Sequence, residues 1–221
     1  FDIVCGNETK EYSVISNPGS TYRWTLNDKQ YFGDKITIKW DMPGGIYDLE
    51  VVETASNGCD GIPVNAKILV TTPADILPDF VKLCEGDSFK FYPGNYIGYL
   101  WHNGSTNDYY ILNKDEKVWV KIIDRYNCEY SDTSYVKVYS LPHFDLGEDL
   151  VLCNEGPYRL EVLGFDKYEW STGDISNYIF VYPGEKTIWL KVTDINGCSA
   201  IDTIKIQECN PEDLLVIPNV F

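Results

Sequence analysis

The sequence predicts an all-β protein built from three tandem β-sandwich domains, each closed by one intradomain disulfide. A frame of a cysteine, a Tyr-x-Trp triplet and a second cysteine occurs three times, and such repetition indicates several small copies of one unit. Apolar and polar residues alternate between closely spaced Gly, Asn, Asp and Pro turns, which is typical of strands in a sandwich. The frames are Cys5, Tyr22, Trp24 and Cys59; Cys84, Tyr99, Trp101 and Cys128; and Cys153, Tyr168, Trp170 and Cys198.

The repeat divides the chain of 221 residues into domains of about 70 residues. We expect the first domain at 1–72, the second at 73–142 and the third at 143–209, followed by a linker and further sequence at 210–221. Domains of this size have thin cores and usually need covalent staples. The seven cysteines fit that role, and disulfides persist in oxidising compartments.

The third repeat shows the expected strands most clearly, because strand-forming residues alternate there with period two. Its strands are expected at 149–153, 158–163, 167–170, 178–182, 187–193 and 199–207. In the first repeat, the strands between the two cysteines are expected at 11–16, 21–26, 35–40 and 47–53. No stretch has a convincing helical period.

Counting strands predicts the disulfide pairs. We expect four strands between the two cysteines of each frame, and each strand carries the chain to the opposite pole of its sandwich. An even number brings the second cysteine back to the first, within the roughly 7 Å that a disulfide allows between Cα atoms. The predicted pairs are Cys5–Cys59, Cys84–Cys128 and Cys153–Cys198. Cys209 is left over, either as a free thiol or as the partner of a cysteine outside this sequence.

The same alternation predicts where the tryptophans point. Trp24, Trp101 and Trp170 share a strand face with a neighbouring tyrosine and are expected in the cores. Trp119 and Trp189 lie opposite the apolar row of their strands and are therefore expected to face outward. An outward tryptophan packs between domains, covers the sheet or stacks on a sugar ring. These two residues are the candidate binding residues.

Composition and motifs argue against several classes of function. The net charge of −16 argues against a nucleic-acid partner, because phosphate binding needs a basic surface. No run of about 18 apolar residues occurs, so no membrane insertion is expected. No G-x-S-x-G elbow, Walker loop, H-E-x-x-H or EF-hand pattern occurs, and small filled domains leave little room for a substrate cleft. We therefore expect no catalytic residues and no enzyme activity.

Metal binding has one candidate site. No C-x-x-C pair and only two histidines are present, so zinc is not expected. Asp145, Glu148 and Asp149 cluster just after the expected second junction, and carboxylate oxygens are the ligands that calcium prefers. The alternative is that this acidic stretch is a solvated turn, in which case the chain has no cofactor.

Three groups of motifs carry a resemblance to a known family. The third repeat contains Asp145-Leu-Gly-Glu-Asp149, Tyr168-x-Trp170-Ser-Thr-Gly and Val192-Thr-Asp-Ile-Asn-Gly-Cys198. The second has Leu83-Cys84, Trp101-His-Asn-Gly104 and Asp132-Thr133, with Tyr126-Asn127 in place of Asn-Gly; the first has Tyr22-Arg-Trp24 and Ser56-Asn-Gly-Cys59. These motifs resemble the PKD/Ig-like repeats of large surface proteins of gliding, Bacteroidetes-type bacteria. The resemblance covers essentially the whole chain and implies three Ig-like or PKD-like sandwiches.

The last six residues resemble a sorting signal. Val216-Ile-Pro-Asn-Val-Phe221 is similar to the opening of the gliding-motility-associated C-terminal domain, which directs type IX secretion. The resemblance implies a secreted or cell-surface bacterial protein whose partner is the type IX secretion machinery.

Together these features predict a non-catalytic stalk or spacer segment of an adhesin-like protein that takes part in gliding or adhesion. Two alternatives stay open. The first is a module that binds surface polysaccharide or another cell-surface protein through Trp119 and Trp189. The second is an accessory region of a secreted hydrolase.

Overall fold

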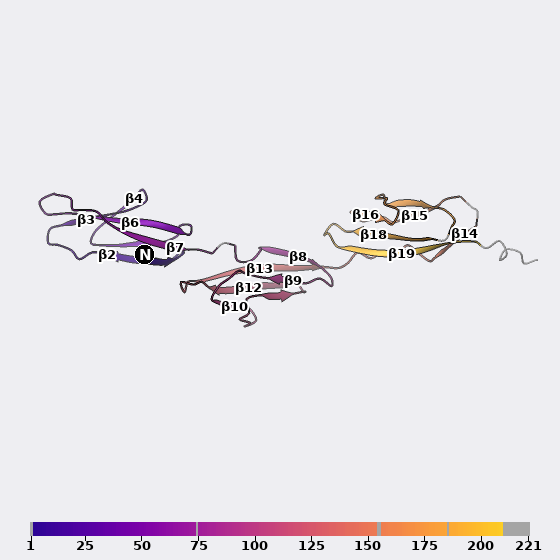
Figure 1. Ribbon diagram of the computed structural model, residues 1–221, viewed down its shortest axis with the longest axis horizontal. Helices are drawn as coiled ribbons and strands as arrows, with labels where there is room; N and C mark the ends of the chain where they lie inside the picture. Colours follow the sequence, from indigo (N-terminus) through magenta and orange to yellow (C-terminus); the bar gives the residue numbers. More distant parts are fainter. Residues whose placement is uncertain (1, 74, 154–155, 185, 210–221) are drawn as a thin grey trace, which may run out of the picture. The chain divides into compact units, whose positions relative to one another are not determined.

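The computed structural model describes residues 2–73, 75–153, 156–184 and 186–209 (Figure 1). Nineteen strands and no helix are found within these ranges. Each sheet takes all its strands from one third of the chain. The predicted all-β class and sandwich architecture are therefore confirmed, whereas the domain limits at 72/73 and 142/143 stay predictions. No helix in the described part of the chain is long and apolar enough to cross a membrane.

Two compact units can be distinguished. Unit 1 comprises Phe1–Asp79, Lys90–Ile111 and Lys117–Tyr135, and unit 2 comprises Phe80–Phe89, Leu112–Glu116 and Val136–Phe221. The first sandwich lies wholly in unit 1 and the third wholly in unit 2, while the second contributes strands to both. Each unit is described separately below.

The first sandwich contains seven strands in two sheets. A five-stranded sheet has the order β1-β7-β6-β3-β4, and β2 pairs with β5 in a two-stranded sheet. The strands are β1 (Asp2–Cys5), β2 (Thr9–Ser13), β3 (Thr21–Leu26), β4 (Lys29–Phe32), β5 (Lys35–Lys39), β6 (Gly45–Thr54) and β7 (Val64–Thr71). Alternate apolar residues of both sheets form its core: Val4, Trp24, Leu26, Ile36, Ile38, Trp40, Leu49, Ile68 and Val70.

The third sandwich has the same plan without a strand equivalent to β4. One sheet has the order β14-β19-β18-β16, and β15 pairs with β17. The strands are β14 (Leu150–Leu152), β15 (Tyr158–Glu161), β16 (Lys167–Trp170), β17 (Tyr178–Val181), β18 (Lys186–Thr193) and β19 (Ser199–Glu208). Its core is again made by alternating inward residues, among them Leu160, Trp170, Ile188, Leu190 and Ile204.

The second sandwich repeats this order. One sheet has the order β10-β12-β13-β8, and β11 pairs with β9. The strands are β8 (Phe80–Cys84), β9 (Phe89–Phe91), β10 (Gly98–Trp101), β11 (Tyr110–Leu112), β12 (Glu116–Ile123) and β13 (Glu129–Tyr139). Phe91 and Trp101 are buried, and their rings contact each other in unit 1 with centroids 6.3 Å apart.

The Tyr-x-Trp triplet fixes two connections in each sandwich. The tyrosine hydroxyl accepts a hydrogen bond from a backbone amide of the preceding loop: Tyr22 from Asn17, Tyr99 from Tyr96 and Tyr168 from Phe165. The tryptophan is buried as predicted, and its Nε1 donates to a carbonyl of the following connection: Trp24 to Gly33, Trp101 to Asn107 and Trp170 to Ser176. The triplet therefore supplies core volume and also holds two loops.

The chain has three disulfides, but the predicted pairs are wrong. The observed bonds are Cys5–Cys128, Cys84–Cys198 and Cys153–Cys209. The cysteine left over is Cys59, which is exposed, and not Cys209. Two of the three bonds therefore join consecutive sandwiches, and only Cys153–Cys209 closes within one.

Strand direction explains why the predicted pairs cannot form. In the first sandwich, β1 is parallel to β7 with Cys5 level with Thr71, the last residue of β7. Cys59 precedes the start of β7, so the two cysteines lie at opposite ends of a strand of eight residues. Such a strand is about 26 Å long, far beyond the reach of a disulfide.

The strand count failed because the chain makes one more reversal than predicted. In the first sandwich the additional strand is β4, which raises the number between Cys5 and Cys59 from four to five. In the third, only β17 separates β16 from β18 along the chain, yet β16 and β18 are antiparallel. The connection 171–177 therefore returns the chain to the other pole without forming a strand.

Candidate functional site

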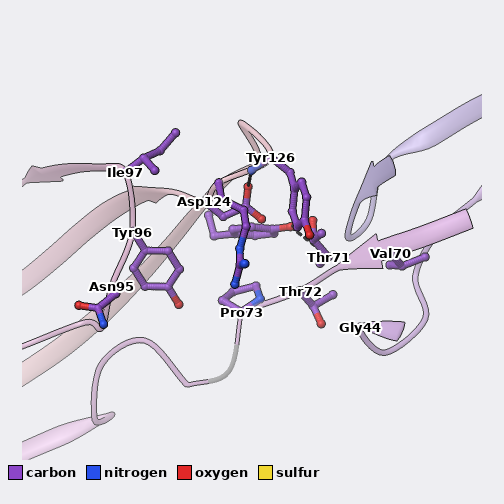
Figure 2. Close-up of a pocket in the computed structure, with 12 residues that line it drawn as sticks. Gly44, Val70, Thr71, Thr72, Pro73, Asn95, Tyr96, Ile97, Asp124 and Tyr126 are labelled. Carbon is purple, nitrogen blue, oxygen red and sulfur yellow. Dashed lines mark hydrogen bonds between the residues drawn. The ribbon is translucent and has the colours of Figure 1, made fainter. Parts of the chain in front are cut away.

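A cavity of about 600 Å³ opens in unit 1 where the end of β7 meets two loops of the second sandwich (Figure 2). Three segments supply most of its lining: the chain leaving β7, the loop before β10, and the turn after β12. The lining residues are Gly44, Val70, Thr71, Thr72, Pro73, Asn95, Tyr96, Ile97, Asp124, Arg125, Tyr126 and Tyr130.

A disulfide and a set of hydrogen bonds surround Thr71 beside this cavity. Cys5 and Cys128 are bonded, with Cα atoms 5.4 Å apart. The Thr71 carbonyl accepts hydrogen bonds from the Tyr130 hydroxyl and from the amide of Gly6. The Thr71 hydroxyl lies 2.7 Å from Tyr130 Oη and 3.2 Å from Cys128 Sγ. The adjacent ends of β1 and β7 are thus both held to the second sandwich, β1 by the disulfide and β7 by the hydrogen bonds of Thr71 with Tyr130.

Two glycines allow the backbone of the first sandwich to approach Thr72 closely. A Cβ atom added at Gly44 would lie 2.6 Å from Thr72 Oγ1, and one added at Gly6 would lie 2.5 Å from Thr72 Cγ2. Real Cβ atoms do not come so near, so any side chain at either position would displace Thr72. The segment that leaves β7 is therefore tightly enclosed on the side of the first sandwich.

Asp124 shapes the turn that carries Cys128. Its Oδ1 accepts hydrogen bonds from the amides of Tyr126 and Cys128, at 2.8 and 2.9 Å. Asn127 has a φ of 66°, a left-handed conformation that asparagine tolerates better than most residues. Gly58 and Gly197 have positive φ at the matching positions of the other sandwiches. The Tyr126-Asn127 departure in the sequence therefore leaves the turn conformation intact.

The other wall of the cavity is formed by the loop before β10. The Tyr99 hydroxyl donates to the carbonyl of Gly94 and accepts from the amide of Tyr96. The rings of Tyr96 and Tyr99 meet edge to face, with centroids 6.3 Å apart. Burial raises the pKa of the Tyr96 hydroxyl, and the nearby groups Tyr99 and Asp124 raise it further.

This arrangement is suited to recognition and mechanical linkage. No cysteine or histidine lines the cavity, and the carboxylate that does, Asp124, already accepts two backbone amides. The side chains of Tyr96, Arg125 and Tyr126 offer aromatic and polar contacts, and the Arg125 guanidinium lies 5.7 Å from the ring centroid of Tyr126.

A second linkage lies within unit 2. Cys84, the last residue of β8, is bonded to Cys198 in the turn between β18 and β19, with Cα atoms 5.5 Å apart. Cys198 Sγ is 4.0 Å from the carbonyl oxygen of Tyr139, which also accepts the amide of Glu85. Asp194 accepts the amides of Asn196 and Cys198, as Asp124 does in the second sandwich. The two linkages therefore have the same construction.

The two candidate binding tryptophans do not lie together. Trp119 is on β12 and 38% exposed, and its carbonyl accepts the amide of His102. Trp189 is half-buried on β18, where its carbonyl accepts the amide of Ser171. Neither lines the cavity beside Thr71. A binding role for either residue stays a prediction.

The candidate calcium ligands are used in backbone hydrogen bonds. Asp145 Oδ1 accepts the amide of Gly147, and Asp149 Oδ1 accepts the amide of Lys205. Glu148 does not join them in a metal site, because no group of three or more His, Cys, Asp or Glu residues among the described residues could hold a metal ion. The turn alternative accounts for the contacts that Asp145 and Asp149 make.

Thr71 and Tyr130 are important residues of this site that the sequence did not reveal. Parallel pairing of the first and last strands would have pointed to Thr71, because it places Cys5 level with that residue. That pairing cannot be inferred from alternation, which reports strand faces and not strand neighbours. Cys128, predicted as a disulfide cysteine, is in the site but with a different partner.

No protein-family model matches this chain, and no curated protein sequence matches it. Among solved structures, the three N-terminal domains of the Highly Immunogenic Outer Capsid protein (Hoc) of bacteriophage RB49 match 93% of this chain and 95% of their own length. Their sequence identity is 12% and the TM-score is 0.36.

Two other solved structures are longer than this chain. SGBP-B of the Bacteroides ovatus mixed-linkage glucan utilization locus, in complex with a mixed-linkage heptasaccharide, is 12% identical with a TM-score of 0.27. The N-terminal eight Ig domains of Down Syndrome Cell Adhesion Molecule are 11% identical with a TM-score of 0.32. The match covers 93% and 95% of this chain but only 66% and 35% of those two. Because these TM-scores and sequence identities are low, the fold class is based on the observed strand order and not on these structures.

Proposed function

We propose that this chain is a non-catalytic, force-bearing spacer segment of a secreted, adhesin-like cell-surface protein. Three disulfides support an oxidising location, since such bonds are rare in the cytosol. Export by the type IX secretion machinery, and a role in gliding or adhesion, rest on the resemblance of the repeats and of 216–221. The residues 216–221 lie outside the described part of the chain.

The overlap of the disulfide loops is the observation that carries this proposal. The loop closed by Cys5–Cys128 contains Cys84, and the loop closed by Cys84–Cys198 contains Cys153. Each loop therefore shares a stretch of chain with the next. No sandwich can be pulled out completely into an extended strand while the bonds are intact.

The shortest covalent path between the two ends measures this restraint. It runs through 1–5, crosses to Cys128, follows 128–153 and crosses to Cys209 before the last residues, about 44 of 221 in all. At about 3.4 Å per residue, the stretched oxidised chain would reach about 150 Å, against about 750 Å when reduced. A segment that holds a distal region away from a cell surface would thus resist unravelling under load.

Pulling single molecules from both termini tests the proposal. The fully stretched length should increase about fivefold, from about 150 to about 750 Å, when a disulfide reductant is added. Equal lengths with and without reductant would contradict the force-bearing role. A Cys59→Ser chain is the matched control, because Cys59 is in no disulfide and its replacement should change neither length.

A glycan- or protein-binding module is the second candidate function. The observation that favours it is the outward position of Trp119, whose ring is partly exposed, since exposed aromatic rings stack on sugars and fill protein interfaces. Binding to a panel of surface polysaccharides and cells should then be saturable and should be lost with Trp119→Ala. Trp189→Ala tests the other predicted residue in the same assay, and flat binding curves for the wild type would rule this function out.

A further inference from the structure

The turn that carries Cys59 has the same construction as the two turns that carry linked cysteines. In each, the cysteine carbonyl accepts the amide four residues earlier: Ala55, Asp124 and Asp194, at 2.9, 3.0 and 2.9 Å. In each, the residue before the cysteine has a positive φ. The three cysteines therefore occupy equivalent positions, in the turns that follow β6, β12 and β18.

Two of these three positions are bonded to the same kind of partner. Cys128 is bonded to Cys5, the last residue of β1, and Cys198 to Cys84, the last residue of β8. In both, the partner ends the first strand of the preceding sandwich. Cys59 is the one free cysteine among the described residues, and it is exposed.

The surface around Cys59 matches the surface that surrounds Cys128. In the second sandwich, the loop before β10 and the turn after β12 together receive Thr71, Thr72 and Pro73. In the first, the loop 14–20 lies against the turn after β6: Asn17 Nδ2 donates to Glu53, and a Cβ on Gly19 would lie 3.0 Å from Ser56 Cβ.

This surface is open and partly apolar. The side chain of Ile15 is 96% exposed and that of Ile62 is 89% exposed, so both are available for contacts. A groove of about 750 Å³ is lined by 16–22 and 32–34. Ile15 belongs to the loop 14–20 and Ile62 comes three residues after Cys59, so a partner that covers these segments would bury apolar surface there.

We propose that this end of the first sandwich, formed by the loop 14–20 and the turn 55–59, docks a β-sandwich domain of the same kind. That domain presents a cysteine at the end of its first strand, which forms a disulfide with Cys59. The bond forms by loss of two electrons and two protons from the two thiols to a disulfide oxidant, such as oxidised glutathione, which is reduced. The proposal rests on the two bonded equivalents and does not require the spacer function.

A variant of this chain can supply the cysteine that tests this docking. Cys153 directly follows Leu152, the last residue of the first strand of its sandwich, and its partner Cys209 directly follows Glu208, the residue level with Leu152 on the parallel strand β19. Cys5 faces Thr71 at the same level. Replacing Cys209 by threonine therefore frees Cys153 and recreates the Cys5–Thr71 arrangement at the end of the third sandwich.

The experiment uses the full chain with Cys209→Thr in a glutathione redox buffer. We expect head-to-tail oligomers joined by Cys59–Cys153 bonds, identified by peptide mass spectrometry after non-reducing electrophoresis. These oligomers should be largely absent from a Cys209→Thr/Cys59→Ser chain, because that chain lacks the thiol that pairs with Cys153. Cys153→Ser is the matched control, because it frees Cys209, which lies at the same end of the sandwich but directly after the last strand.

Two results would overturn the proposal. One is a Cys209→Thr chain that stays monomeric while its Cys5–Cys128 and Cys84–Cys198 bonds are intact. The other is equal coupling of Cys59 to Cys153, to Cys209 and to itself, which would make it an unselective thiol. If mapping shows scrambled bonds in Cys209→Thr, the same comparison is made with Cys209→Ala, which frees Cys153 with a smaller side chain.

Discussion

Replacing both Cys5 and Cys128 with serine is expected to more than double the covalent path that carries tension. Without this bond, the shortest path follows 1–84, crosses to Cys198 and follows 198–221, about 108 residues. The oxidised wild type has a path of about 44 residues. At about 3.4 Å per residue, the variant should stretch about 220 Å further.

Single-molecule force spectroscopy with handles at both termini measures this difference directly. The relevant quantity is the contour length after the last unfolding event under oxidising conditions. Because this length is measured after every sandwich has unfolded, the folded lengths do not affect the comparison. In reductant, wild type and variant should reach the same length.

The oxidised wild type also distinguishes the observed pairs from pairs within each domain. Bonds between Cys5 and Cys59, Cys84 and Cys128, and Cys153 and Cys198 would leave a path of about 81 residues, or about 275 Å. A measured length near 275 Å instead of about 150 Å would refute the observed pairs. A variant that stretches no further than the wild type would refute the reasoning from overlapping loops.

Three further predictions concern single side chains. Trp170→Ala should lower the free energy of unfolding of the third sandwich by about 3–5 kcal/mol, because it empties a fully buried site; urea unfolding measures this, and Ile195→Ala on an exposed side chain should change it by less than about 0.5 kcal/mol. Tyr130→Phe should make Cys5–Cys128 more easily reduced by dithiothreitol, because the lost hydrogen bond to Thr71 contributes about 1 kcal/mol; unchanged reduction relative to the exposed control Tyr135→Phe would count against this role. Burial opposes a low pKa at Asp194, but the amides of Cys198, Asn196 and Gly197 outweigh it and lower that pKa. Its contribution to stability should therefore be present above the unfolded pKa of about 3.9 and be lost as the pH falls through the folded value. Urea midpoints between pH 6 and 2 should show this loss, and Asp194→Asn should reduce it.

The fold class and the core could be predicted because both depend on short-range pattern. Period-two alternation places Trp101 and Trp170 inward whatever strand lies beside them, and both are buried. The same pattern gave the six strands of the third sandwich to within a few residues. Burial of alternate side chains is a local property of a strand, so the prediction required no knowledge of topology.

The disulfide pairs depended on information that alternation does not contain. Lys29–Phe32 forms β4 although only Tyr31 of its four residues is partly buried, so the strand has no clear apolar face to reveal it. Its omission changed the strand count from odd to even. In the other sandwiches, residues without strand structure make the reversal, which no count of strands could include. One missed strand reverses the outcome of a strand count, whereas one wrong assignment changes a predicted core by a single residue.

Parallel pairing of the first and last strands determines what a cysteine at the end of the first strand can reach. Such a cysteine lies at the opposite pole from the turn cysteine of the same sandwich, and beside the end of the last strand of that sandwich. In the third sandwich that neighbouring position holds Cys209, and the bond closes within the domain. In the first it holds Thr71, so Cys5 bonds to Cys128 beyond the domain and Thr71 binds Tyr130 instead. The residue at the end of the last strand thus decides whether a sandwich is linked to the next or closed on itself, which is why exchanging Cys209 for threonine should convert one arrangement into the other.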